Sequence, residues 1–115
     1  VQSDLLSGLY HVEDNIEGVG IINYNVQVYQ MEDSFNRMHI EGFADFVIVV
    51  DMEIEGEQIR IERQIPSGWT AEEFVEGTGT YDGESKSLVS FSYSIGYLWQ
   101  GELVVESGNA SYTKL

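Results

Sequence analysis

VVDMEIEGEQIRIER, residues 49–63, alternates apolar and polar side chains on both sides of a single glycine. A period of two residues is typical of a β-hairpin with one buried and one solvated face. We expect Glu55 and Gly56 to form a two-residue turn, because this register gathers the apolar side chains on one face. The predicted cross-strand pairs are Ile54 with Glu57, Met52 with Ile59, Val50 with Ile61, Glu53 with Gln58, and Asp51 with Arg60.

The same alternation continues through most of the chain, with glycine-containing turns between the segments. In residues 22–28 the apolar side chains occupy even positions and the amide side chains occupy odd positions. We therefore predict an all-β fold, an antiparallel up-and-down meander barrel or half-barrel of about eight strands. Other strand-forming segments are GLYHVE, NYNVQVYQM, MHIEGFADFVIVV and ELVVE, and VEGTGTYDGESKSLVSFSYSI is a further hairpin around Asp82 and Gly83.

Three segments depart from simple alternation. Pro66 cannot donate to a ladder, and Thr70 followed by Glu73 resembles a capping box, so we predict one short helical turn near 70–75. Gly77 and Gly79 lie two residues apart on one face, as needed where a strand bends sharply or another segment crosses closely. The glycine in ESGNA, residues 106–110, predicts a final turn.

Length and composition indicate one domain with its own core. The chain has 115 residues, of which 43% are hydrophobic, and we assign residues 1–7 as an N-terminal tether and 8–115 as a single domain. The formal charge of −15 repels phosphate backbones and anionic lipids, so nucleic acid is not an expected partner. Cysteine is absent, and no run of residues is apolar enough to form a transmembrane segment. The start at Val1 suggests a removed leader, and we expect export.

Two patterns resemble metal sites. DMEIEGEQIRIE, residues 51–62, has carboxylates and a glycine at EF-hand spacing, but an EF-hand requires flanking helices and these residues alternate as strands do. His11 and His39 each have a glutamate two residues on, yet a lone strand histidine is more often a surface residue. We predict a hairpin at 51–62, no metal site and no cofactor. Weak binding of divalent cations to this acidic hairpin is the alternative that the sequence leaves open.

Aromatic residues are the best candidates for a binding site. A closed sheet of about eight strands encloses either a packed core or a small apolar cavity. Aromatic side chains on the inner face would line that space, and Trp69 lies in the irregular segment after Pro66. We select Tyr24, Trp69, Tyr93 and Trp99 as the ligand-binding candidates. No serine lies in a nucleophile elbow, and 20 acidic residues give no specific carboxylate pair, so we predict no catalytic residue.

The chain resembles the lipocalin-like (calycin-like) domains of small secreted proteins and lipoproteins of Bacteroidetes-type bacteria. The resemblance depends on LLSGLYHV, on GTGTYD followed by LVSFSYSI, and on the strand order. Lipocalins have a Gly-x-Trp in the first strand with an arginine over the ring. Gly8-Leu9-Tyr10 would be its counterpart here, and Lys114 would take the place of the arginine. The resemblance implies a meander barrel, periplasmic or attached to the outer membrane, that in some members holds an apolar small molecule.

Two functions follow from these patterns. The first is a non-enzymatic, exported, lipocalin-like domain that binds a small apolar ligand in the barrel mouth, where apolar burial supplies the affinity. The alternative is a structural or interaction module of the cell envelope, with a filled barrel and no small-molecule ligand. That module would dock an envelope protein or a glycan through its acidic face or a sheet edge.

Overall fold

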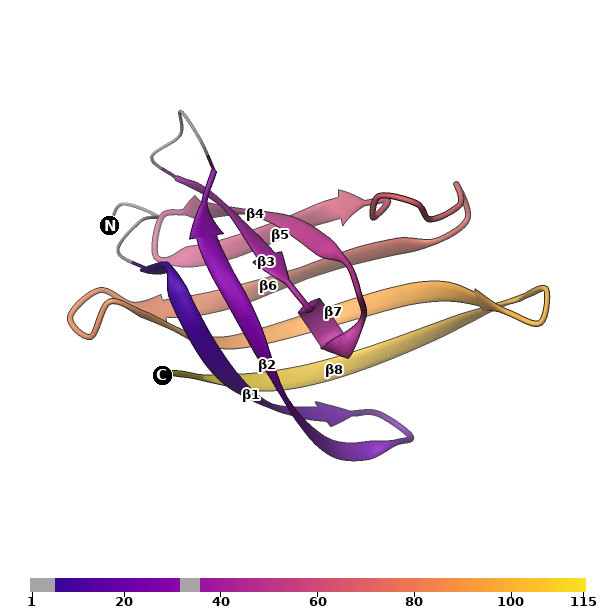
Figure 1. The fold of residues 1–115 in the computed structure, drawn as a ribbon, viewed down its shortest axis with the longest axis horizontal. Coiled ribbons are helices and arrows are strands. Elements are labelled where there is room, and N and C mark those ends of the chain that lie inside the picture. The colour runs from indigo at the N-terminus through magenta and orange to yellow at the C-terminus, as the bar shows by residue number, and fades with distance from the viewer. Residues whose placement is uncertain (1–5, 32–35) are drawn as a thin grey trace.

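The computed structural model describes residues 6–31 and 36–115. It is a closed antiparallel barrel in which each strand pairs with its neighbour in sequence and β8 returns to β1 (Figure 1). This confirms the predicted up-and-down meander of about eight strands. The strands are β1 (Gly8–Ile16), β2 (Gly20–Gln30), β3 (Arg37–Glu41), β4 (Val49–Glu55), β5 (Gln58–Gln64), β6 (Phe74–Asp82), β7 (Ser87–Trp99) and β8 (Glu102–Lys114).

The core residues occupy alternate positions of the strands, as predicted. In β1 the inward side chains are Tyr10, Val12, Asp14 and Ile16, and all four are buried. In β2 the even positions from 24 to 28 are buried, and the amide side chains between them are exposed. Leu6, within the predicted tether, is also fully buried and accepts a hydrogen bond from the Tyr10 hydroxyl at 2.6 Å. Residues 1–5 of that tether lie outside the described residues.

The predicted register of the β4–β5 hairpin was wrong by two residues. Glu53 pairs with Arg60 and Glu55 with Gln58, so the turn residues are Gly56 and Glu57. The reason lies in the turn: Gly56 has φ 65 and occupies the first central position, so neither flanking glutamate needs a positive φ. A shift of two residues preserves the faces, which therefore agree with the prediction.

The predicted helical turn near 70–75 is a hydrogen-bonded turn without a helix. The Glu73 amide donates to the Thr70 carbonyl at 3.0 Å, and strand β6 begins directly after it at Phe74. The Glu73 carboxylate does bond back to the Thr70 amide at 2.9 Å, as the capping-box pattern suggested. A 3-10 turn, η2 (Phe43–Asp45), lies instead in the connection from β3 to β4. In the described part of the chain, no helix is long and apolar enough to span a membrane.

Small residues on β6 and β8 make room for the large rings of β7. Gly77 and Gly108 face Tyr93 from either side, and Gly79 faces Phe91. A Cβ at Gly79 would lie 2.5 Å from the Phe91 ring, which confirms the predicted close approach at the β6 glycines. Gly108, the glycine of residues 106–110, likewise makes room for the Tyr93 ring. The predicted turn there was wrong, because β8 continues unbroken through it.

Candidate functional site

The structure brings together two of the four predicted ligand-binding residues. The hydroxyls of Tyr24 and Tyr93 both donate to Oδ2 of Asp14, each at 2.6 Å. Asp14 is fully buried, and Tyr24 and Tyr93 are 9% and 5% exposed. Trp69 and Trp99 lie elsewhere, on different parts of the molecule. The selected tyrosines are therefore core residues that hydrogen-bond a buried carboxylate.

A third tyrosine completes this interior group. Tyr112 of β8 packs its ring on Phe91, with centroids 5.1 Å apart, and its hydroxyl has no hydrogen-bond partner among the described residues. The same is true of Oδ1 of Asp14. We call Asp14, Tyr24, Tyr93 and Tyr112 the Asp14 cluster. Sequence reasoning missed Asp14, although its position in phase with Tyr10 and Val12 was the available signal.

The cluster holds its phenols in the neutral form. Burial raises the pKa of Tyr24, Tyr93 and Tyr112 well above the ordinary tyrosine value. The nearby charge of Asp14 adds to the increase in each, and for Tyr24 and Tyr93 so does the hydrogen bond to that carboxylate. A neutral phenol can donate to a carboxylate, and charge-assisted hydrogen bonds of this kind are the stronger ones. The arrangement therefore gives the buried Asp14 side chain two hydrogen-bond donors inside the barrel.

Replacing Tyr112 by phenylalanine is expected to stabilise the protein by up to about 1 kcal/mol, because a buried hydroxyl without a partner is costly. Tyr10→Phe is the matched control. The Tyr10 hydroxyl donates to the Leu6 carbonyl and accepts from the Leu88 amide at 3.1 Å, so its loss should destabilise by about 1–3 kcal/mol. Urea unfolding measures both. A destabilised Tyr112→Phe variant would mean that this hydroxyl has a partner.

Trp69 lies at the mouth of the barrel, in the connection between β5 and β6. Its ring packs edge-on against Phe46, with centroids 5.5 Å apart, and Phe46 also contacts Tyr97 of β7 at 5.3 Å. Beside Phe46 is an open groove of about 540 Å³, lined mainly by residues 45–49 together with Glu41, Gly42 and Ser67. Its wall includes Val47, whose side chain is fully exposed, and Val49, which is 41% exposed. We call this depression the mouth groove.

Trp99 does not line this groove. It ends β7 at the tip of the β7–β8 hairpin and is 63% exposed. It pairs with Glu102 across the hairpin. The structure thus places the two tryptophans in separate environments, Trp69 packed against Phe46 of the mouth groove and Trp99 at the hairpin tip.

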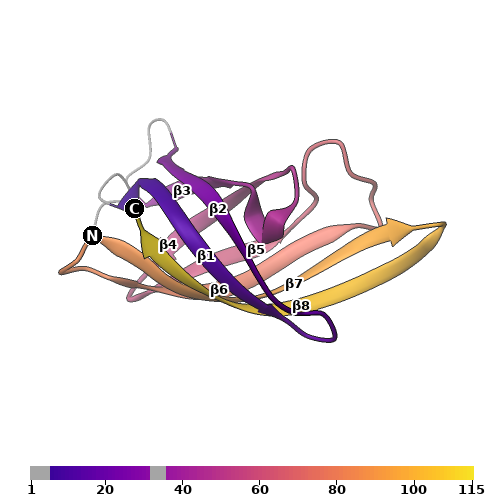
Figure 2. The ribbon, with the colours of Figure 1, turned by 60° about the horizontal axis from the view of Figure 1, so that its bottom comes forward.

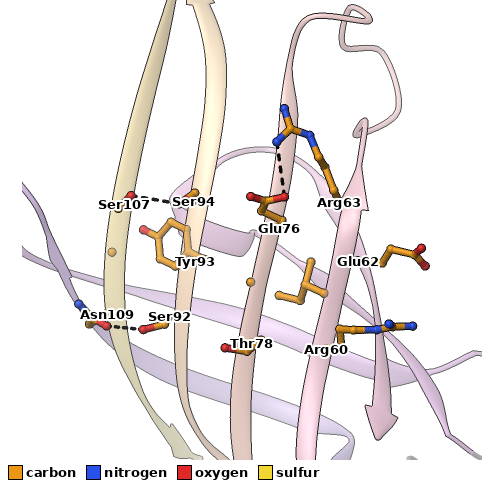
Figure 3. A pocket seen from close by; sticks show the side chains of 13 residues that line it. Arg60, Glu62, Arg63, Glu76, Thr78, Ser92, Tyr93, Ser94, Ser107 and Asn109 are labelled. Atoms are coloured by element: carbon orange, nitrogen blue, oxygen red, sulfur yellow. Dashed lines mark hydrogen bonds and ion pairs between the residues drawn. The ribbon is translucent and has the colours of Figure 1, made fainter.

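A second, larger depression lies on the outer face of β5 to β8 and has a volume of about 640 Å³ (Figure 3). Its walls include the ion pair between Arg63 and Glu76, 3.5 Å apart. Its floor has short polar side chains that bond one another across strands: Ser92 with Asn109 at 2.5 Å, and Ser94 with Ser107 at 3.1 Å. These side chains satisfy each other, so the depression has the character of a solvated sheet face.

The histidines do not come together. His11 on β1 contacts the side-chain oxygens of Asn25 and Asn23 at 3.0 and 3.1 Å, and these hydrogen bonds raise its pKa. His39 on β3 pairs with Asp51 at 2.6 Å, and β2 lies between β1 and β3. Residues 51–62 form the predicted hairpin. Over residues 6–31 and 36–115, no group of three or more His, Asp, Glu or Cys side chains is arranged to hold a metal ion.

No protein-family model matches this chain, and none of the curated proteins compared with it gives a match.

Proposed function

We propose that this protein is an exported, non-enzymatic, lipocalin-like binding domain that takes a small apolar ligand in the mouth groove. The observation that carries the proposal is the groove beside Phe46, whose volume of about 540 Å³ lies within the usual range for small-molecule sites. Exposed Val47 and Val49 supply apolar surface that a ligand would bury. Burial of such surface contributes about 25 cal/mol per Å².

The packing of the interior favours the mouth over the inside of the barrel. Phe43, next to the mouth, packs edge-on against both Phe91 and Tyr93, with centroids 6.1 and 5.1 Å apart. Phe43 and Phe91 are almost fully buried, as are the apolar residues of β3 to β5 that belong to the same core. Side chains alone can fill a barrel of this size. The ligand therefore binds at the surface, between the β3–β4 connection and Ser67.

One contact supports the lipocalin-like assignment. The Lys114 ammonium lies over the Tyr10 ring, 5.9 Å from its centroid, where the resemblance places a basic side chain. The hydroxyl of that tyrosine reaches the Leu88 amide and so links β1 to β7 across the barrel. Export to the periplasm or the outer membrane remains a prediction, tested by fractionating cells that produce the protein from its natural gene.

The two tryptophans make the test direct. Trp99→Phe leaves Trp69 as the single tryptophan, in contact with Phe46. Titration with dodecanol or N-phenylnaphthylamine is expected to change the Trp69 fluorescence with saturation. In that background Val47→Asp should weaken binding about tenfold or more, because the ligand would have to desolvate a carboxylate. Val19→Asp is the matched control, since Val19 is 61% exposed and lies in the β1–β2 turn, outside the groove.

Equal binding by the Val47→Asp and Val19→Asp variants would place the ligand elsewhere. Absence of any response to either lipophile would favour the second candidate, an interaction module of the cell envelope with a filled barrel. The packed interior around Phe43 is the observation that supports this module. Pull-down from envelope extracts would then be expected to recover a partner protein or glycan.

A further inference from the structure

Strand β8 is longer than the strand that covers its edge. β1 pairs with β8 from Lys114 to Gly108, and the last bond of this ladder joins the Glu17 amide to the Ser107 carbonyl at 2.9 Å. Beyond Ser107 the described residues provide β8 with a partner only on its β7 side. Figure 2 shows the β7–β8 hairpin extending past the β1–β2 hairpin at this end. Residues 102–106 are thus an open strand edge.

The backbone groups on this edge can be identified from the register. Within a strand, the N–H and C=O of alternate residues point to the same side. The Ser107 carbonyl faces β1, so the backbone groups of Val105 and Leu103 face the same, open side. Their side chains are also exposed, at 55% and 47%. The edge therefore offers two donors and two acceptors beside exposed apolar surface.

The opposite edge of the same hairpin is protected. β6 begins at Phe74, opposite Gly96, so the last residues of β7 extend beyond it. There the Glu73 carboxylate accepts a hydrogen bond from the Leu98 amide at 2.8 Å. Backbone hydrogen bonds from Thr70 and Leu98 lower the pKa of Glu73, so the carboxylate is charged when it covers this edge. Proteins protect free edges in such ways because an open edge pairs with other chains.

We propose that the open edge of β8 docks an extended, basic segment of a partner protein by strand addition. In this mode main-chain hydrogen bonds supply affinity, and side chains along the strand supply specificity. Glu102 and Glu106 lie at the two ends of the edge, on the opposite face of β8 from Leu103 and Val105, and the Glu106 carboxylate accepts a hydrogen bond from the Tyr97 hydroxyl at 3.0 Å. A docked strand would place its basic residues opposite these two carboxylates and its apolar residues opposite Leu103 and Val105. A second copy of this chain is a poor occupant, because each copy has a net charge of −15.

Hydrogen exchange measured by NMR tests the proposal. In the free protein the Leu103 and Val105 amides should exchange fast, whereas the Val104 amide, which faces β7, should be protected. The probe is the capped peptide Lys-Val-Thr-Val-Lys, and Glu-Val-Thr-Val-Glu is its acidic control. The basic peptide should slow exchange at Leu103 and Val105, and the acidic peptide should not. Protection that increases with protein concentration alone would identify a second copy as the occupant and overturn the proposal.

Val105→Pro is the sharpest variant. The lost N–H faces the open side, so no ladder bond to β7 is removed and the fold should persist. Binding of the basic peptide should fall about tenfold or more, because one backbone donor is gone. Val105→Lys retains the backbone N–H and should also weaken binding of the basic peptide. This variant replaces Val105→Pro in the test if the proline variant unfolds. Glu102→Gln should weaken binding about twofold to fivefold.

Val89→Lys, at a 43% exposed valine near the other end of β7, is the control and should bind normally. Wild-type affinity in both Val105 variants, or no protection by the basic peptide, would overturn the proposal. This test is independent of the mouth groove, because no residue of the edge lines that groove.

Discussion

Replacement of Tyr24 and Tyr93 together by phenylalanine is expected to destabilise the barrel by about 3–5 kcal/mol, because Asp14 would remain buried without its two donors. Each hydroxyl donates to the same carboxylate oxygen at 2.6 Å. Each single variant should lose about 1.5–3 kcal/mol, the usual value for a hydrogen bond to a charged group. Urea unfolding at neutral pH, with the slope compared between variants, measures these losses.

Two further variants show whether this loss of stability comes from the buried Asp14 carboxylate. Adding Asp14→Val to the double variant should recover most of the stability, because replacing a whole buried polar group by apolar side chains is often neutral. Tyr97→Phe makes the same change at a part-exposed phenol, which donates to Glu106 at 3.0 Å, and should cost about 1 kcal/mol or less. If the double variant loses no more than Tyr97→Phe, the two hydroxyls do not stabilise Asp14.

The second large effect is expected in alkaline solution. The pKa values of Tyr24, Tyr93 and Tyr112 are raised in the folded protein, chiefly by burial, above the ordinary value of 10.0. Their contribution to stability is complete below that pH and is lost as the pH increases above it, because the unfolded chain releases these protons first. Three such groups together lower the free energy of unfolding by up to roughly 4 kcal/mol for each pH unit. The typical stability of a protein is about 5–15 kcal/mol.

We therefore expect a cooperative alkaline transition that begins above the ordinary tyrosine pKa. The circular dichroism of the sheet and the absorbance of these tyrosinates should change together. Tyr112→Phe, which removes one of these buried phenols, should make the stability depend less steeply on pH in this range. Tyrosinate absorbance of all seven tyrosines before any loss of β-structure would contradict the expectation.

Much of the fold could be predicted because a strand with one buried face shows its period directly in the sequence. Residues 22–28 alternate without exception, as do residues 50–55 and 58–62 on either side of the Gly56 turn, and in these strands the barrel has one exposed and one buried face. The register of the β4–β5 hairpin could not be predicted as well, because a shift of two residues leaves both faces unchanged. Only the backbone conformation of Gly56 decides between the two registers.

The candidate site was harder to predict, because it depends on contacts between distant strands. Asp14 is one of 20 acidic residues, and its neighbour Glu13 is exposed. Only the closed ring brings β1 beside β8, and so Asp14 close to Tyr93 and Tyr112. The turn predicted at Gly108 was wrong for the same reason. Its lack of a side chain accommodates the Tyr93 ring from the neighbouring strand, which the local sequence does not reveal.

The pairing of the first strand with the last also affects how the chain folds. Tyr10 is paired with Lys114, and the Leu115 amide donates to the Leu9 carbonyl at 2.8 Å. The barrel therefore cannot close before β8 has been synthesised, and until then one edge of β1 has no partner strand. Sheets dominated by such distant pairings fold in about milliseconds to seconds. Until β8 pairs with it, the β1 edge is an open strand edge of the kind that pairs with other chains and leads to aggregation.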